Sequence, residues 1–168
     1  MTFELTNTVA AVGTFLVIAA SAVAAVVQIR HLRISNQLSG LLTVLTLMQS
    51  RDMRELFDFV RHDLAVLLRD EEFVAGLRSI PIDRRTHPEL YVCQFFDHIG
   101  AHVRSGLIDE AAYLRAAWYD TQLYWTLLAP VVAVGRTGRP HVFENFEYLA
   151  GLATAWGNRL PSVAPEPT

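Results

Sequence analysis

The sequence has very little cysteine, since Cys93 is the only one in 168 residues. A single cysteine cannot build the disulfide framework that stabilises many small secreted domains. The sequence also lacks any stretch in which apolar and polar residues alternate for long enough to predict a sheet. The first absence agrees with a folded part in a reducing compartment such as the cytoplasm, and the second favours an all-α chain.

Charge of either sign is absent from one long segment. Between Leu5 and Ile29 no side chain is charged, and the run ends at Arg30 and Arg33. The apolar part, Thr8–Ile29, would rise about 33 Å as a helix, which is enough for a hydrocarbon core of roughly 30 Å. We therefore predict an N-terminal tail and a single transmembrane helix over residues 1–29, which contacts the lipid bilayer through Thr8–Ile29.

The basic side chains around this helix predict its direction. Arg30 and Arg33 follow the helix, whereas only Glu4 and the α-amino group precede it. Positive flanks stay on the cytoplasmic side, so we expect a single-pass protein of the cell membrane with its N-terminus outside. Residues 20–22 resemble a signal-peptide cleavage site, but the segment before the helix lacks the basic residues of a signal peptide. We expect the helix to be retained.

The rest of the chain is close to electrical balance. All 14 basic residues and all but one of the 17 acidic residues lie after residue 29. This balance lacks the basic excess of a dedicated nucleic-acid surface, so we expect no nucleic-acid partner. The length suffices for one domain with a core, which we place at residues 30–158. Three prolines in a short polar terminus predict a disordered tail over residues 159–168.

Apolar residues recur at helical spacing in the first half of this domain. A stripe from Leu38 to Met48 continues the membrane helix, and a second stripe from Met53 to Leu68 follows a predicted N-cap at Ser50. A short helix is expected over Glu71–Leu77, before a connection over residues 79–86.

Prolines, glycines and capping residues divide the second half. Pro88 is expected at the first position of a helix that stops at Gly106, and Asp109 is expected to cap the next helix. We expect that helix to break or bend before the apolar stretch 123–134, which contains a proline. The loop 135–140 then leads to a final helix. The stripe of the final helix is Phe143, Phe146, Leu149, Ala150, Ala153 and Trp156. The predicted fold class is therefore all-α, with one N-terminal transmembrane helix followed by a cytoplasmic multi-helix bundle.

Several short motifs occur together in one order and spacing. They are Leu32-Arg33 with Asn36-Gln37-Leu38, Phe95-Phe96 with Ile99-Gly100 and Gly106-Leu107-Ile108-Asp109, Tyr124-Trp125 with Pro130, and the run 143–150. Through these motifs the chain resembles an uncharacterised, mostly bacterial family of membrane-anchored all-helical proteins classed as a domain of unknown function. The resemblance covers most of residues 30–150. It implies a helical domain on a tether and brings no active site to transfer.

His98 and His102 are the candidate metal ligands. They stand four residues apart on one predicted helix, a spacing at which two imidazoles can share a metal ion. The residues between them lack the glutamate of a metalloprotease, and no acidic or cysteine cluster nearby offers a third ligand. Because both histidines lie opposite the apolar stripe, exposed polar positions explain them better, and we expect no metal site.

Two further groups have both a chemical and a structural interpretation. Cys93 can be a nucleophile, but a buried structural thiol is the preferred interpretation because Glu89 and Asp97 would disfavour a thiolate. Glu144 and Glu147 can act as acid and base, but at the start of a helix they also suit the positive end of its dipole. Between them, Asn145 can hydrogen-bond a neighbouring helix and fix its register.

Cations and aromatic rings supply the remaining candidates. Arg136, Arg139 and His141 surround Gly138 in a loop that can hold a phosphate, although a solvated loop is preferred. That loop, or Arg84-Arg85, can also face anionic lipid head groups. A set of large rings within 13 residues can line a ligand groove, although core packing is preferred. The set is Tyr113, Trp118, Tyr119, Tyr124 and Trp125.

No combination of these residues predicts a catalytic site, so we expect neither an enzyme nor a cofactor. We expect a membrane-tethered helical interaction or scaffold domain that contacts an unknown membrane or cytoplasmic protein at the cytoplasmic face. The sequence is also consistent with a homo-oligomer. The small residues at 20 and 24 would let two membrane helices approach closely, and the Leu38–Met48 stripe can pair between protomers. The alternative is a sensor or enzyme for a small ligand or a metal. Its site would lie between helices and use His98, His102 or the loop around Arg136.

Overall fold

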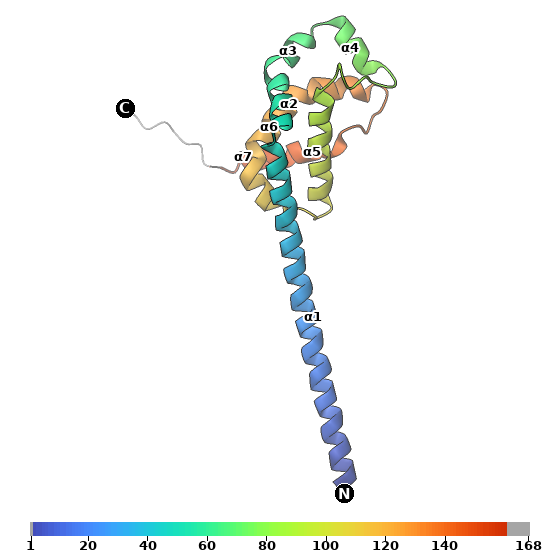
Figure 1. Cartoon of the computed structure of the whole chain (residues 1–168), viewed down its shortest axis with the longest axis vertical. Coiled ribbons are helices and arrows are strands. Elements are labelled where there is room, and N and C mark those ends of the chain that lie inside the picture. Colours follow the sequence, from blue (N-terminus) through green and yellow to red (C-terminus); the bar gives the residue numbers. More distant parts are fainter. Residues whose placement is uncertain (1, 161–168) are drawn as a thin grey trace, which may run out of the picture. The chain divides into compact units, whose positions relative to one another are not determined.

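The computed structural model describes residues 2–160, with side chains described from Gly13 onward. Over residues 2–160 the chain forms seven helices and no strand (Figure 1), which confirms the all-α fold class. The helices are α1 (Thr2–Met48), α2 (Arg51–His62), α3 (Leu64–Leu67), α4 (Glu71–Arg78), α5 (Glu89–Arg104), α6 (Glu110–Arg136) and α7 (Glu144–Gly157). Most of the tail predicted to be disordered, residues 161–168, lies outside the described residues.

The chain divides into two compact units, one up to Leu38 and one from Ser39 onward. The first unit is a single stretch of helix, and its side chains from 13 to 36 are exposed. Among the described residues one helix, Gly13–Met48, is long and apolar enough to cross a membrane, with a mean hydropathy of 1.8. Helix α1 runs without a break from Thr2 to Met48, so the predicted membrane helix and the stripe that follows it belong to one helix.

Capping residues begin the helices of the second unit where the sequence predicts them. The Ser50 hydroxyl accepts a hydrogen bond from the Met53 amide at 3.3 Å, and an Asp109 carboxylate oxygen accepts one from the Ala112 amide at 2.8 Å. The predicted stripe from Met53 to Leu68 is divided, because α2 ends at His62 and α3 begins at Leu64. Pro88 occupies the cap position of α5, one residue before the predicted position.

The end of α5 is a Schellman motif around Gly106. This glycine has φ 72°, and its amide and that of Leu107 donate hydrogen bonds to the carbonyl oxygens of Val103 and His102 at 3.0 and 2.9 Å. Left-handed backbone of this kind carries a steric cost for residues with a Cβ, so glycine suits the position. The predicted stop of this helix is confirmed.

Two predictions about the second half of the chain are wrong. Helix α6 continues through the apolar stretch 123–134 and through Pro130 to Arg136, so the helix does not break before residue 123, although a bend there stays a prediction. Gly135 and Arg136 belong to the helix rather than to a loop. Phe143 is not part of the final helix. It precedes α7 in the left-handed conformation, with φ 57°.

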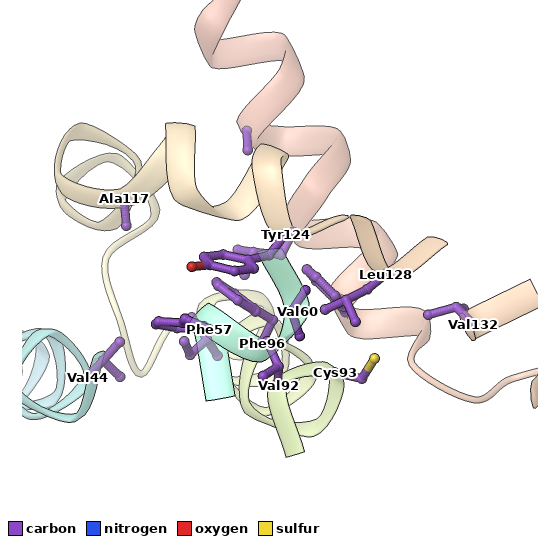
Figure 2. Packing of buried hydrophobic residues seen from close by; sticks show 14 of the residues in the cluster. Val44, Phe57, Val60, Val92, Cys93, Phe96, Ala117, Tyr124, Leu128 and Val132 are labelled. Carbon is purple, nitrogen blue, oxygen red and sulfur yellow. The ribbon is translucent and has the colours of Figure 1, made fainter. Parts of the chain in front are cut away.

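Aromatic rings form the centre of the core in the second unit (Figure 2). Phe57 of α2 stacks on Tyr124 of α6 with ring centroids 4.3 Å apart, and Phe96 of α5 stacks on Phe146 of α7 at 4.9 Å. Phe96 also lies 5.6 Å from Tyr124, so the two pairs form one cluster. Stacked rings of this kind add favourable energy beyond the burial of their apolar surface. Helices α5 and α6 both pack against α7 around this cluster.

Candidate functional site

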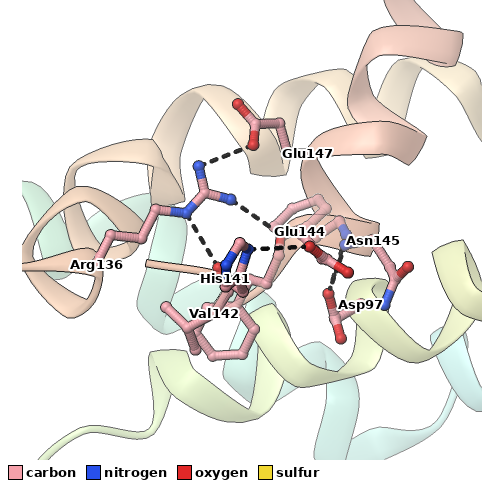
Figure 3. A network of polar contacts seen from close by, with 9 residues as sticks. Asp97, Arg136, His141, Val142, Glu144, Asn145 and Glu147 are labelled. Carbon is pink, nitrogen blue, oxygen red and sulfur yellow. Dashed lines mark hydrogen bonds and ion pairs between the residues drawn. The ribbon is translucent and has the colours of Figure 1, made fainter. Parts of the chain in front are cut away.

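The first turn of α7 is held by a carboxylate from another helix. Phe143 occupies the cap position, but a phenyl ring cannot accept the hydrogen bonds that a helix start requires. An oxygen of Asp97, on α5, accepts hydrogen bonds from the amides of Asn145 and Phe146 at 3.0 and 3.1 Å (Figure 3). Asp97 therefore caps α7 and places a negative charge at the positive end of its dipole.

The same two helices approach closely at Gly100, one turn after Asp97. A Cβ at this position would overlap the backbone carbonyl oxygen of Asn145. Because only glycine leaves room for the α7 backbone here, Asp97 and Gly100 together fix how α5 meets the start of α7. The sequence predicts that Asn145 fixes the register between helices. Its backbone N–H, rather than its side chain, makes this contact by donating a hydrogen bond to Asp97.

Arg136 fastens the segment before α7 to the end of α6. Its guanidinium donates to the carbonyl oxygens of Val142 and Phe143 at 3.1 and 3.5 Å and forms an ion pair with Glu147 at 2.8 Å (Figure 3). Arg136 is therefore neither a solvated loop residue nor free for a phosphate, and Asp97 already occupies the amides at the α7 N-terminus. The second carboxylate, Glu144, lies 3.5 Å from His141, so the two glutamates bind different partners.

A groove of about 650 Å³ lies beside this network. Its walls come from the end of α4, the connection before α5, the outer face of α5, the last turns of α6 and the segment before α7. The groove brings together four candidate or flanking residues from the sequence analysis: Arg84, His98, Arg139 and His141. His102 lies outside the groove. His98 and His102 are exposed, and His102 is in the last turn of α5.

A buried polar cluster at the start of α5 is not anticipated by the sequence. His87 and Glu89 are 2% and 0% exposed, and His87 Nδ1 lies 3.0 Å from a carboxylate oxygen of Glu89. The other carboxylate oxygen of Glu89 has no hydrogen-bond partner. Burial raises the pKa of Glu89, against the lowering effects of its backbone hydrogen bond and of His87. An acidic residue in a first helical turn is usually exposed, so no sequence signal marks this burial.

Cys93 lies one turn after Glu89 and is 0% exposed. Burial, followed by the charge of Glu89, raises the pKa of the thiol well above its ordinary value. A thiol in this environment stays protonated and is a poor nucleophile. The preferred interpretation of Cys93 as a structural residue agrees with these surroundings.

The predicted aromatic set divides between core and surface. Tyr113 and Tyr124 are fully buried, and the Tyr113 hydroxyl lies 2.8 Å from the Thr121 hydroxyl. Trp125 packs edge-on against Phe146, whereas Tyr119 is 62% exposed. The Tyr124 hydroxyl has no hydrogen-bond partner, and burial raises its pKa to about 12. These rings do not form one ligand-lining wall.

Within the part of the chain that the structure describes, no group of three or more His, Cys, Asp or Glu side chains is arranged to hold a metal ion. The family model described as a domain of unknown function (DUF4760) matches residues 15–156. No curated protein and no solved structure matches the chain. Because the matched range covers most of the sequence, the chain belongs to the DUF4760 family.

Proposed function

We propose that this protein is a single-pass protein of the cell membrane whose helical domain works at the cytoplasmic face as an interaction or scaffold domain. The observation that carries the proposal is the exposed apolar segment of α1. Large side chains such as Phe15 and Ile18 are 70% and 61% exposed there. Water around such a segment is unfavourable, whereas a bilayer covers it and its helical backbone needs no further hydrogen bonds. Arg30 and Arg33 favour a cytoplasmic position for the residues that follow.

The polar contacts support a binding role over a catalytic one. Asp97, Arg136 and Glu147 form the polar network beside the groove, and all three are engaged in holding helix ends together. Cys93 is buried and protonated. These carboxylates and the thiol, the groups from which acid-base or nucleophilic chemistry would be expected, are therefore committed to the fold.

Exposed leucines on α1 support a protein partner. Leu38 and Leu42, one turn apart on α1, are 54% and 55% exposed, and they follow the segment that we place in the membrane. Apolar side chains in a row on one helix are typical of a helix that packs against another protein or a second copy of the chain.

Membrane insertion is tested with the full chain carrying a C-terminal tag in bacterial membranes. Alkaline carbonate should leave the protein in the pellet, and protease added to intact spheroplasts should leave the tag undigested. Val17→Lys with Ala20→Lys should release the protein, because a charge at the centre of a span costs about 2.5–3.5 kcal/mol. Ala133→Lys with Ala155→Lys, at exposed positions of the second unit, is the matched control. Digestion of the tag would show the reverse direction, and release of the parent protein would refute the anchor.

Partner contact is tested with single cysteines in the same membranes. Leu42→Cys should form cross-linked adducts with a bis-maleimide, whereas Thr126→Cys, at an exposed position on α6, should not. Cys93 is buried and should contribute little to the background. Adducts of double mass would identify a homo-oligomer, and adducts of other masses would identify a second protein. Equal labelling patterns for the two cysteines would contradict a partner surface on α1.

A second candidate function is the binding of a small ligand between helices. The observation that favours it is the groove beside α5, whose volume of about 650 Å³ lies within the range of roughly 300–1,000 Å³ that is usual for ligand sites.

A further inference from the structure

The interior of the groove is mostly aliphatic. Leu77 comes from α4, Ile80 and Ile82 from the connection, Leu90 from α5, Val131 from α6 and Phe143 from the segment before α7. Ile80 is 82% exposed, although it is a large apolar residue at the edge of an apolar groove. A surface of this kind gains free energy when apolar atoms of a ligand cover it. The groove therefore favours a ligand with a hydrocarbon portion.

The polar groups in the lining are engaged unequally. Gln94 accepts a hydrogen bond from Arg84 at 2.8 Å, and one oxygen of Asp97, the carboxylate in the lining, accepts from the two α7 amides. His141 pairs with Glu144, and the neighbouring Asp83 accepts from the Arg85 amide. The carboxylate of the lining is thus engaged as the cap of α7.

The groups that remain available are hydrogen-bond donors. Among the described residues the side chains of Arg139 and His98 make no hydrogen bond or ion pair. Arg84, whose guanidinium lies 5.2 Å from the centroid of the Tyr91 ring, keeps further N–H donors beyond the one that meets Gln94. Two guanidinium groups in the lining of a largely apolar groove favour an anion, because guanidinium donors match the oxygens of a carboxylate and remain charged at every physiological pH.

We propose that this groove binds the anion of a long-chain fatty acid, with the carboxylate at Arg84 and Arg139 and the alkyl chain along the aliphatic interior. An alkyl chain fits this interior better than a peptide, because a peptide brings backbone N–H and C=O groups that the aliphatic side chains cannot pair. The site goes beyond the interaction role proposed above and does not depend on the anchor, since every lining residue belongs to the second unit.

The test uses the full chain in nanodiscs of zwitterionic phosphatidylcholine and a photoreactive fatty acid with a diazirine in its chain. After illumination, mass spectrometry should find labelled residues within 77–90 and 131–143. Unlabelled palmitate should suppress this labelling, whereas hexadecanol, which has the same chain without the charge, should not. Labelling confined to residues 13–36 would show partition into the bilayer only and would overturn the proposal. Equal suppression by hexadecanol would do the same, because it would remove the role of the anion.

Matched arginine variants test the head-group contact. Arg84→Gln with Arg139→Gln should lower the labelling of the groove by about tenfold or more, because both cationic contacts are lost. Arg69→Gln with Arg115→Gln, two exposed arginines outside the groove, should leave it unchanged. Undiminished labelling in the first pair would refute the site. Displacement of the probe by an apolar peptide but not by palmitate would assign the groove to a protein instead. Carbonate extraction of the same variants reports separately on the anchor.

Discussion

Glu89 is a carboxyl group without solvent exposure and with one oxygen unpartnered, so its protonation is linked to stability. Its pKa in the folded protein is raised above the ordinary value of 4.5. Between pH 4.5 and the raised pKa, the Glu89 carboxyl is mostly ionised in the unfolded chain but mostly protonated in the folded protein. Stability should therefore be greatest below the ordinary pKa and should fall as the pH rises through the raised value.

Glu89→Gln should reduce this fall, because an amide resembles the protonated carboxyl and keeps an oxygen near His87. We expect the free energy of unfolding to vary less between pH 4.5 and pH 8 in the variant than in the parent. Urea unfolding followed by tryptophan fluorescence measures it, since all three tryptophans lie in the second unit. Glu72→Gln, at an exposed position of α4, is the control. An unchanged pH slope in Glu89→Gln would contradict the assignment.

Phe146 should matter more for stability than the two candidate metal ligands together. Its ring is fully buried between Phe96 and Trp125, so Phe146→Ala should cost about 3–5 kcal/mol. His98→Gln with His102→Gln should cost at most about 1 kcal/mol, because both side chains are exposed. Urea unfolding of the two variants side by side makes the comparison. If the histidine pair proves as damaging as Phe146→Ala, and a chelator reproduces the loss in the parent, a metal site becomes the better account.

At the scale of elements, two helical glycines allow the effect of close packing on stability to be measured apart from the effect of helix propensity. They are Gly100, where two helices meet, and Gly151, which has open space around it. Gly100→Ala should destabilise the protein by about 1–3 kcal/mol, because the new methyl group meets the α7 backbone. Gly151→Ala, in α7, meets no atom within 4 Å and should stabilise the helix by roughly 0.5–1 kcal/mol. The same unfolding measurement decides the signs. Destabilisation by Gly151→Ala would contradict the open space at that position, and stabilisation by Gly100→Ala would refute the close approach of α5 and α7.

A helix end can be predicted from the sequence when the residue that fixes it lies within a few positions of that end. Ser50, Asp109 and Gly106 act on backbone groups within a few positions, and the sequence predicts all three. The break predicted before residue 123 is wrong, because α6 is continuous there and packs against α4 and α7, which lie far from it in the sequence. The cap of α7 could not be predicted because Asp97 lies 48 positions before the amide that it binds.

The candidate site shows the same limit. Spacing along one helix identifies His98 and His102 as a pair, but the groove brings His98 together with residues from four other parts of the chain and leaves His102 out. The sequence shows that residues 135–141 contain cationic side chains. It does not show which of them are free to bind a ligand, because Arg136 donates to a backbone carbonyl oxygen that only the fold brings close to it.

At the scale of the whole molecule, residues 30–168 should fold without a membrane. The core of the second unit is formed by its own helices and does not use the apolar segment before residue 37. We expect this fragment to be soluble and strongly helical by circular dichroism, with cooperative melting. Gradual loss of helix on heating would indicate that the domain needs lipid or another subunit. Leu42→Asp, at an exposed position, tests whether any association of the fragment arises from the exposed face of α1.

The borrowed cap of α7 also affects how the folded protein opens. Helix ends usually fray, so their amide hydrogens exchange with solvent through small local fluctuations. The amides of Asn145 and Phe146 are instead tied to α5, and they lose their partner only when α5 and α7 separate. Their hydrogen exchange should therefore be slow and should follow that of the buried core amides. The beginning of α7 would then report the separation of two helices, and Asp97→Ala would return it to ordinary fraying.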